Sequence, residues 1–211
     1  MEGIHNSWRP FFEYVFKTEY WADIQRTLKE RSSYNQITPR KQMCFEIFKH
    51  ISVFDIQKVV IGEAPYTTTY KADGKSVSYN TGIAFASSNS ESIPNLLSAF
   101  KEAYSFNHID VFDTSLITYI KQGIFFINKV VTGDLNKHPR NHWGVVRWDL
   151  FTYDLIRYIE LNNKRNKIYY SYGAIAAISK SILNENSIYY AEKSPLYYRT
   201  NNKLNIMKMW K

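Results

Sequence analysis

Four short segments carry groups that could hold a planar ligand. Residues 59–66, Val-Val-Ile-Gly-Glu-Ala-Pro-Tyr, form a β-branched strand pattern that runs into a loop with glycine and proline. In open α/β sheets, loops at the carboxyl ends of strands form ligand sites. Phe85 supplies an aromatic face, Asn128 a side-chain amide, and residues 194–196, Ser-Pro-Leu, an apolar wedge. Such groups can hold a base taken out of a nucleic-acid stack and fill the gap that it leaves.

The composition is that of a basic globular protein. The chain has 211 residues, of which 45% are hydrophobic, so we expect one domain with one sizeable core over residues 1–211. The net charge of +8 favours a polyanionic partner such as DNA. The single cysteine, Cys44, excludes an intramolecular disulfide. No apolar run is long enough to span a bilayer and no signal-peptide pattern is present, so we expect an intracellular protein without a membrane partner.

Helical and strand patterns alternate along the chain. Four short hydrophobic strands separated by helices predict an α/β fold, a three-layer α/β/α arrangement with a central four-stranded parallel sheet. The polar segment 67–81 contains the turn signal Asp73-Gly74, whose carboxylate could fold over a ligand site or simply face solvent. We expect strands at 58–62, 123–128, 167–171 and 187–191, and helices at 7–16, 21–31, 39–49, 94–104, 113–121, 144–161 and 173–184.

Five motifs occur in the order in which one known enzyme family carries them. They are Gly-Glu-Ala-Pro-Tyr-Thr at 62–67, Gly-Ile-Ala-Phe-Ala at 82–86, Lys-Gln-Gly-Ile-Phe-Phe-Ile-Asn at 121–128, Tyr-Gly-Ala at 172–174 and Glu-Lys-Ser-Pro-Leu at 192–196. In this order they resemble Gly-Gln-Asp-Pro-Tyr-His, Gly-Leu-X-Phe-Ser, Lys-Gln-Gly-Val-Leu-Leu-Leu-Asn, Trp-Gly-Ser and His-Pro-Ser-Pro-Leu. These are motifs of the first, bacterial and eukaryotic, family of uracil-DNA glycosylases, and the resemblance covers nearly the whole chain.

The resemblance implies a role for each motif in binding a flipped base and the DNA around it. Tyr66 would pack against the base edge where thymine carries a methyl group, Phe85 would stack on the base, and Asn128 would pair with the Watson–Crick edge of uracil. Leu196 would enter the minor groove and fill the vacated stack. The other candidate DNA contacts are the backbone N–H groups of Gly173 and Ala174 at a helix start, together with Lys193, Ser194, Pro195 and Arg199.

Two catalytic positions of the resembled family are replaced. Its aspartate, which orients water and opposes the positive charge on the sugar, corresponds to Ala64, which can do neither. Its histidine, which stabilises charge on uracil O2, corresponds to Glu192. An ionised Glu192 would repel the leaving anion, because two like charges about 4 Å apart cost about 4 kcal/mol at an effective dielectric near 20. A protonated Glu192 could instead donate a hydrogen bond.

Glu63 is a second candidate for the acidic role. Gly-Glu-Ala-Pro also opens the first motif of the thermophile-type uracil-DNA glycosylases, which lack the aspartate. By that resemblance Glu63 could act as the acid, or it could serve only to stabilise its loop. Those enzymes, however, have glycine where this chain has Tyr66, and they retain a histidine in the last motif.

The loop after Asn128 also carries polar and aromatic residues. His138 and His142 lie four residues apart without a cysteine cluster, so no metal site is expected. Together with Lys137, Arg140 and Trp143, they could form a DNA-facing loop or an ordinary solvated one.

Three functions remain open from the sequence. The first is a divergent DNA glycosylase acting on uracil or a modified pyrimidine, with Glu63 as the acid. The second is a catalytically inactive relative that binds DNA, for example as a replication accessory factor. The third is an interaction module for a replication or repair protein. Retention of Tyr66, Phe85 and Asn128 favours the first two, whereas loss of both catalysts argues against efficient excision. No cofactor is expected for any of them.

Overall fold

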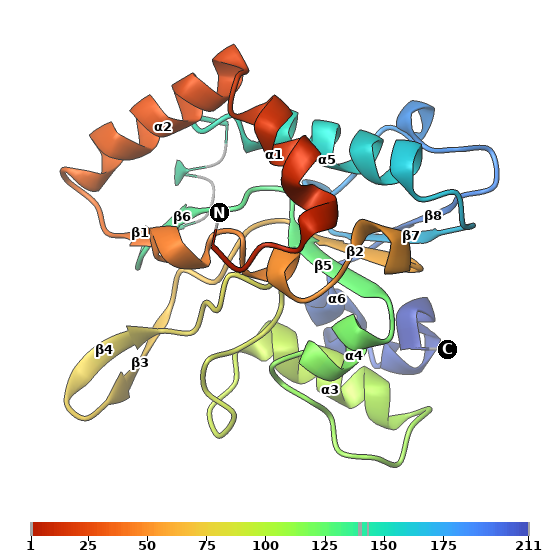
Figure 1. Ribbon diagram of the computed structural model, residues 1–211. Coiled ribbons are helices and arrows are strands. Elements are labelled where there is room, and N and C mark those ends of the chain that lie inside the picture. The colour runs from red at the N-terminus through yellow and green to blue at the C-terminus, as the bar shows by residue number, and fades with distance from the viewer. Residues whose placement is uncertain (1, 139–140, 143, 211) are drawn as a thin grey trace.

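A four-stranded parallel sheet in the order β5-β2-β7-β8 forms the centre of the computed structural model (Figure 1). The structure describes residues 2–138, 141–142 and 144–210. The predicted fold class is confirmed, and each strand lies within one residue of its expected bounds. The strands are β2 (Lys58–Gly62), β5 (Ile124–Asn128), β7 (Ile168–Tyr172) and β8 (Ile188–Glu192).

The strand register brings the ends of the motif-bearing strands together. Gly62 at the end of β2 pairs with Asn128 at the end of β5. Tyr172 at the end of β7 pairs with Glu192 at the end of β8. Because all four strands are parallel, their carboxyl ends share one edge of the sheet, and the loops that follow them meet there.

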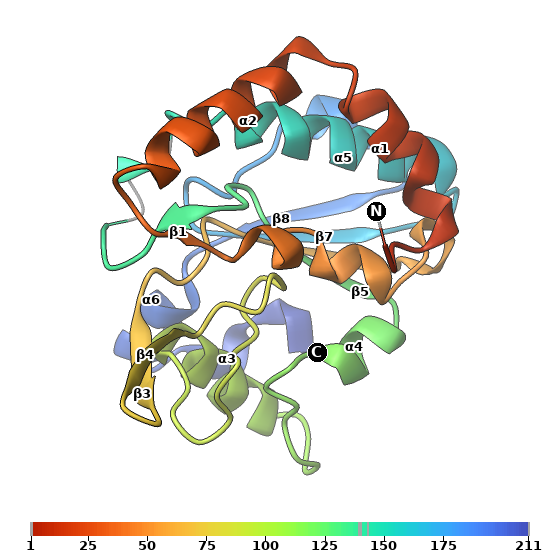
Figure 2. The same cartoon turned by 60° about the vertical axis from the view of Figure 1, so that its left-hand side comes forward.

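Helices cover both faces of the sheet, as Figures 1 and 2 show. One face carries α1, α2 and α5, and the other carries α3, α4 and α6. None of the helices in the described part of the chain is long and apolar enough to cross a membrane. The bounds are α1 (Arg9–Val15), α2 (Glu19–Ser32), α3 (Asn95–Ser105), α4 (Ile117–Lys121), α5 (Trp148–Asn162) and α6 (Pro195–Thr200).

Aromatic side chains fill the space between each helical layer and the sheet. On the α1–α5 side, Trp8 packs on Phe125 of β5 with ring centroids 5.5 Å apart, and Phe11 packs on Phe151 of α5 at the same distance. On the other side, Phe100 of α3 packs edge-on against Tyr172 of β7 at 5.3 Å. Strand β2 is apolar at each position from Val59 to Ile61, as expected for a parallel strand covered on both faces.

A buried lysine and a buried glutamate join α5 to β7. Glu160 is 3% exposed and Lys167 is fully buried, with Lys167 Nζ 3.4 Å from Glu160 Oε1. Lys167 also donates to the carbonyl oxygens of Asn163 and Arg165 at 2.6 and 2.8 Å. Burial lowers the pKa of Lys167, and the nearby Glu160 carboxylate opposes that shift. The lysine thus satisfies otherwise unpaired groups at the end of α5.

Two of the predicted helices are wrong. Over residues 39–49 the structure has two short 3-10 helices, Lys41–Met43 and Glu46–Lys49, in place of one α-helix. These tighter turns still bury Ile47 and Phe48, so the apolar pattern that predicted an α-helix fits them as well. Over residues 173–184 there is a loop with one 3-10 turn at Lys180–Ile182. Gly173 opens this loop in the left-handed region, with φ +98°, which interrupts a right-handed helix directly after β7.

The polar segment 67–81 forms a hairpin that the sequence indicated only through its turn. Strands β3 (Thr69–Ala72) and β4 (Lys75–Ser78) pair antiparallel and extend away from the central sheet (Figure 1). The turn residues Asp73 and Gly74 both have positive φ, 49° and 73°. Asp73 is exposed at this turn, so its carboxylate faces solvent. A second antiparallel pair joins β1 (Ile37–Thr38) to β6 (Gly133–Asp134).

Candidate functional site

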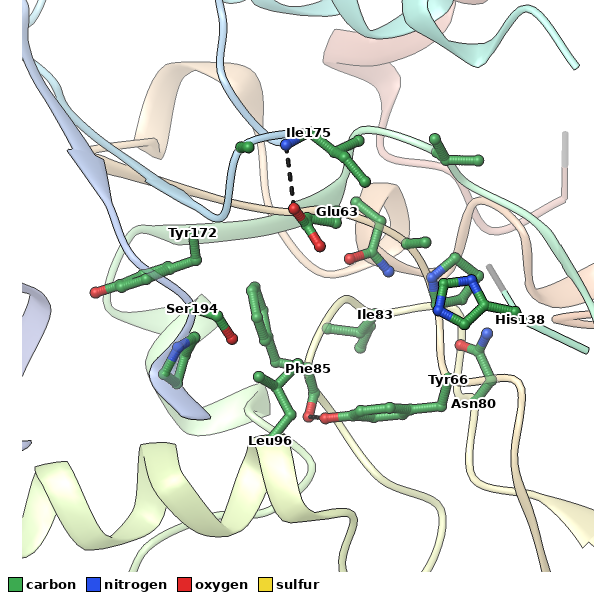
Figure 3. Close-up of a pocket in the computed structure, with 16 residues that line it drawn as sticks. Glu63, Tyr66, Asn80, Ile83, Phe85, Leu96, His138, Tyr172, Ile175 and Ser194 are labelled. Atoms are coloured by element: carbon green, nitrogen blue, oxygen red, sulfur yellow. Dashed lines mark hydrogen bonds between the residues drawn. The ribbon is translucent and has the colours of Figure 1, made fainter. Parts of the chain in front are cut away.

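A cavity of about 390 Å³ opens at the carboxyl edge of the sheet (Figure 3). This volume is within the range of small-molecule sites. Most of the base-binding candidates meet there, although they are far apart in the sequence. The sequence-predicted residues in its lining are Glu63, Tyr66, Phe85, Asn128, Ala174, Ser194 and Pro195.

Gly62 allows the aromatic face and the amide to lie against each other. A Cβ atom at this position would be 2.4 Å from Asn128 Oδ1 and 2.9 Å from Phe85 Cζ. Both distances are too short for any side chain other than hydrogen. The glycine that ends β2 therefore creates the space in which Phe85 and Asn128 come together.

The Phe85 ring is fixed from several sides. Its backbone lies in the left-handed region, with φ 68°, and the side chain is only 4% exposed. The ring packs on Phe100 with centroids 4.7 Å apart. Tyr66 Oη donates to the Phe85 carbonyl oxygen at 2.8 Å, and burial raises the pKa of Tyr66, so the phenol stays a neutral donor. These contacts preorganise both aromatic residues before any ligand arrives.

The Asn128 amide is available to a ligand. The side chain is half-buried at the end of β5 and makes no hydrogen bond to any other residue that the structure describes. An amide offers an acceptor oxygen and two donor hydrogens in one plane. That set matches a flat ligand that presents an N–H beside a carbonyl.

Glu63 lines the cavity and also holds the loop after β7. Its Oε1 accepts a hydrogen bond from Ile175 N–H at 3.1 Å (Figure 3). A Cβ at position 173 would lie 2.5 Å from the same oxygen, so Gly173 makes room for the carboxylate. Since no helix starts at Gly173 and Ala174, the helix N-terminus expected there for phosphate is absent, and Glu63 takes up one of the local N–H groups.

Glu192 is placed differently from the other candidates. It ends β8, but it is not part of the cavity lining. Its carboxylate instead accepts a hydrogen bond from Tyr198 Oη on α6. The Glu192 carboxylate is thus engaged by a tyrosine that, like Glu192, is not part of the cavity lining.

The last motif passes from the cavity wall to the surface. Ser194 and Pro195 line the cavity, and Pro195 begins α6. Leu196 follows with 39% of its surface exposed. Lys193 is exposed, with Nζ 6.0 Å from the Tyr197 ring centroid. Arg199 pairs with Glu102 of α3 at 2.9 Å, so its guanidinium is held toward α3.

Comparison with known proteins identifies what this arrangement resembles. No protein-family model matches the chain. The uracil-DNA glycosylase of Bacillus cereus strain AH187 is 29% identical over 209 residues, covering 94% of this chain and 86% of that enzyme. The enzyme of Borreliella burgdorferi strain ZS7 is 27% identical over 203 residues, with the same coverage. A mimivirus uracil-DNA glycosylase variant, solved in complex with UGI, superposes with a TM-score of 0.76 at 25% identity, covering 90% of this chain and 70% of that one.

The fold is that of a uracil-DNA glycosylase. The glycosylase of Nitratifractor salsuginis also shares it, with a TM-score of 0.63 at 15% identity over 96% of this chain and 89% of that one. Both curated relatives bear the name uracil-DNA glycosylase.

Further residues complete the cavity of this uracil-DNA glycosylase fold. His138 and Tyr172, which the sequence placed in a candidate DNA-facing loop and in a motif, contribute to the lining, as do Asn80 and Leu96, which the sequence did not single out. Asn80 lies two residues before the motif that begins at Gly82, and this proximity was the only indication of Asn80 in the sequence. His138 comes from the loop after β5, while Arg140 and Trp143 of that loop lie outside the described residues.

A buried hydrogen-bond network holds the same loop against α2 and α5. Arg31 of α2 pairs with Asp134, and His142 Nδ1 lies 3.2 Å from the other oxygen of that carboxylate. His142 Nε2 is 2.7 Å from Thr132 Oγ1, and the same oxygen accepts a hydrogen bond from Trp148 Nε1 at 2.7 Å. His142 is fully buried, and burial lowers its pKa below the ordinary 6.5, although Asp134 opposes the shift.

We expect the thermal stability of the protein to fall as the pH drops below about 6.5. Above that value His142 is neutral in both states, so its contribution to stability is fully present. Below that pH, His142 is protonated in the unfolded chain but still neutral in the folded protein. Its contribution to the free energy of unfolding therefore decreases and is lost as the pH falls through the lowered pKa of the folded state. Melting curves between about pH 5 and 8 measure this. His142→Gln should flatten the slope in that window, whereas His5→Gln, at an exposed site, should not. An unchanged slope in His142→Gln would show that another group causes it.

Proposed function

We propose that this protein is a divergent DNA glycosylase-type protein that takes a uracil-like or modified pyrimidine out of DNA into the cavity at the sheet edge. The observation that carries the proposal is the close approach of two side chains above Gly62. The Asn128 amide, which makes no hydrogen bond to any other described residue, lies there beside the immobilised aromatic face of Phe85. A flipped base needs both of these groups, one for its edge and one for its plane.

The surface around the cavity supports DNA as the partner. Leu196 is exposed directly beyond the cavity-lining Pro195, where it can fill the gap left by the flipped base. Lys193 is exposed on the same turn, and the chain carries a net charge of +8. Binding is therefore expected to weaken with salt, because each phosphate contact releases counterions.

Glu63 is the residue that we propose for the acidic role. One carboxylate oxygen is used by Ile175 N–H, and the other has no hydrogen-bond donor among the described residues. The carboxylate is therefore fixed in direction while one oxygen stays available to water or to the sugar. Ala64, although it lines the cavity, supplies no such group.

An excision assay tests this role. Labelled single-stranded oligonucleotides with one uracil or one modified pyrimidine are incubated with the protein, and abasic sites are cleaved with alkali. Excision by the natural protein that is lost in both Glu63→Gln and Asn128→Ala supports the proposal. The amide oxygen introduced by Glu63→Gln can still accept from Ile175 N–H, so this variant keeps the loop contact. Glu185→Gln is a matched control at an exposed position. Excision that persists in Glu63→Gln would show that Glu63 is not the acid.

A second candidate function is supported by the position of Glu192. Because its carboxylate bonds Tyr198 and Ala64 is inert, neither usual catalytic position offers a group to the ligand. A catalytically inactive relative that binds DNA as a replication accessory factor fits these facts. It predicts binding of uracil-containing DNA without excision. Undetectable or salt-insensitive DNA binding would favour an interaction module instead.

Phe85→Ala should weaken binding to a uracil-containing single strand by about 1–3 kcal/mol, because it removes the stacking face. Fluorescence anisotropy with labelled oligonucleotides measures the affinity. Phe54→Ala is the control, since Phe54 is 54% exposed and outside the cavity lining. Equal affinities of Phe85→Ala and the natural protein, with the fold intact by circular dichroism, would remove stacking on Phe85 from the account.

A further inference from the structure

Asn80 is a buried amide with an unused donor. Its side chain is only 7% exposed, and its Oδ1 accepts a hydrogen bond from Gly82 N–H at 3.1 Å. That bond decides which end of the amide is the acceptor. Nδ2 is buried and has no hydrogen-bond partner among the residues that the structure describes. A buried polar group in this state requires an explanation, since leaving it unpaired costs about 1–3 kcal/mol.

Asn80 is part of the cavity wall. Asn80 lines the same space as Phe85 and Asn128, and Figure 3 draws it at the Tyr66 end, away from Tyr172. The turn that carries it is held rigidly. Gly82 has φ +85°, and a Cβ there would lie 1.8 Å from the Met43 carbonyl oxygen, so the backbone is packed tightly against that residue. A fixed backbone thus holds the buried amide at the wall of the cavity.

We propose that Asn80 is a specificity-determining residue whose Nδ2 donates a hydrogen bond to O4 of the bound pyrimidine, the exocyclic oxygen that cytosine replaces with an amino group. This inference rests on the proposed function, namely that a base enters the cavity. It adds a second amide to the one supplied by Asn128, on a different segment of the chain. The expected ligands are pyrimidines of the uracil class, which carry oxygens at both exocyclic positions of the ring.

The same donor disfavours cytosine. Cytosine replaces one exocyclic oxygen of uracil with an amino group, which is itself a donor. Two donors that face each other leave both unpaired, and the buried amide then keeps its full desolvation cost. Asn80 therefore separates uracil from cytosine by chemistry rather than by size, which matters because the two bases have nearly the same shape.

The variant Asn80→Asp isolates the donor. A carboxylate keeps an oxygen for Gly82 N–H, so the turn is preserved, while the other end changes from donor to acceptor. Asn89→Asp is a matched control for the added negative charge. Asn89 accepts from Glu91 N–H and Ser92 N–H through its own Oδ1, both at 2.9 Å, and it is not in the cavity lining. Both variants therefore keep their backbone hydrogen bonds and differ in access to the ligand.

Binding of four proteins to two oligonucleotides tests the proposal; the proteins are the natural protein and its variants Asn80→Asp, Asn89→Asp and Phe85→Ala. The oligonucleotides differ only in one nucleotide, a deoxyuridine or a deoxycytidine analogue whose glycosidic bond resists hydrolysis. We expect the natural protein and Asn89→Asp to prefer the uracil analogue, and Asn80→Asp to reduce that preference by about tenfold or more. An unchanged preference in Asn80→Asp overturns the role of Asn80 but leaves the proposed function intact. If the natural protein shows no preference between the two oligonucleotides, and Phe85→Ala binds them with the same affinity as the natural protein, the base-binding function fails. The role of Asn80 then fails with it.

Discussion

Replacing Ala64 with aspartate and Glu192 with histidine in the same protein should raise the rate of uracil excision by about 10²–10³, because one preorganised charge-stabilising group that faces the ligand is commonly worth that much. Ala64 lines the cavity, so an aspartate there would face the ligand. Histidine at position 192 would remove a carboxylate that opposes a departing anion. Single-turnover excision from a uracil-containing single strand measures the rate.

The two single variants are the controls for this restoration. Since Glu192 bonds Tyr198 and lies outside the cavity lining, Ala64→Asp alone should provide most of the gain. A double variant that folds, binds uracil-containing DNA as tightly as the natural protein and still shows no gain would contradict the view that only the catalysts are missing.

Lys167→Met should lower the free energy of unfolding by about 3–5 kcal/mol, because it leaves the buried Glu160 carboxylate without its cation. It also removes the donor to the Asn163 and Arg165 carbonyl oxygens at the end of α5. Urea unfolding followed by circular dichroism measures the loss. Lys164→Met is the matched control at an exposed neighbouring position, where the change should be small. A loss in Lys167→Met no larger than in the control would show that the buried pair does not stabilise this fold.

The parallel sheet could be predicted because its strands carry a pattern that few other structures produce. Residues 58–62 and 124–128 are short apolar runs bounded by glycine or polar residues, as expected where helices cover both faces. Once the strands are parallel, the loops after them must meet at one edge. The convergence of Tyr66, Phe85 and Asn128 on one cavity therefore follows from the order of the motifs.

Other features depend on contacts between distant segments, which a local pattern does not contain. The apolar spacing in 173–184 suits a helix, but the Glu63 carboxylate bonds Ile175 N–H and Gly173 turns left-handed beside it. The hairpin of β3 and β4 is polar and partly exposed, so alternation of apolar residues does not mark it. Asn80 carries no signal in the sequence beyond its proximity to the motif at Gly82, and its role is indicated only by the folded cavity, where its Nδ2 has no hydrogen-bond partner among the described residues.

The central claim is that a uracil-type base occupies the cavity beside Phe85 and Asn128. The most direct measurement compares the affinity of the natural protein for two oligonucleotides that are identical except for one position, a hydrolysis-resistant deoxyuridine analogue or the corresponding thymidine analogue. The two differ by one methyl group, which lies on the base edge that Tyr66 is proposed to contact. Because Tyr66 is fixed against the Phe85 carbonyl and cannot move aside, we predict tighter binding of the uracil analogue by about tenfold. Equal affinity for the two oligonucleotides would contradict the account.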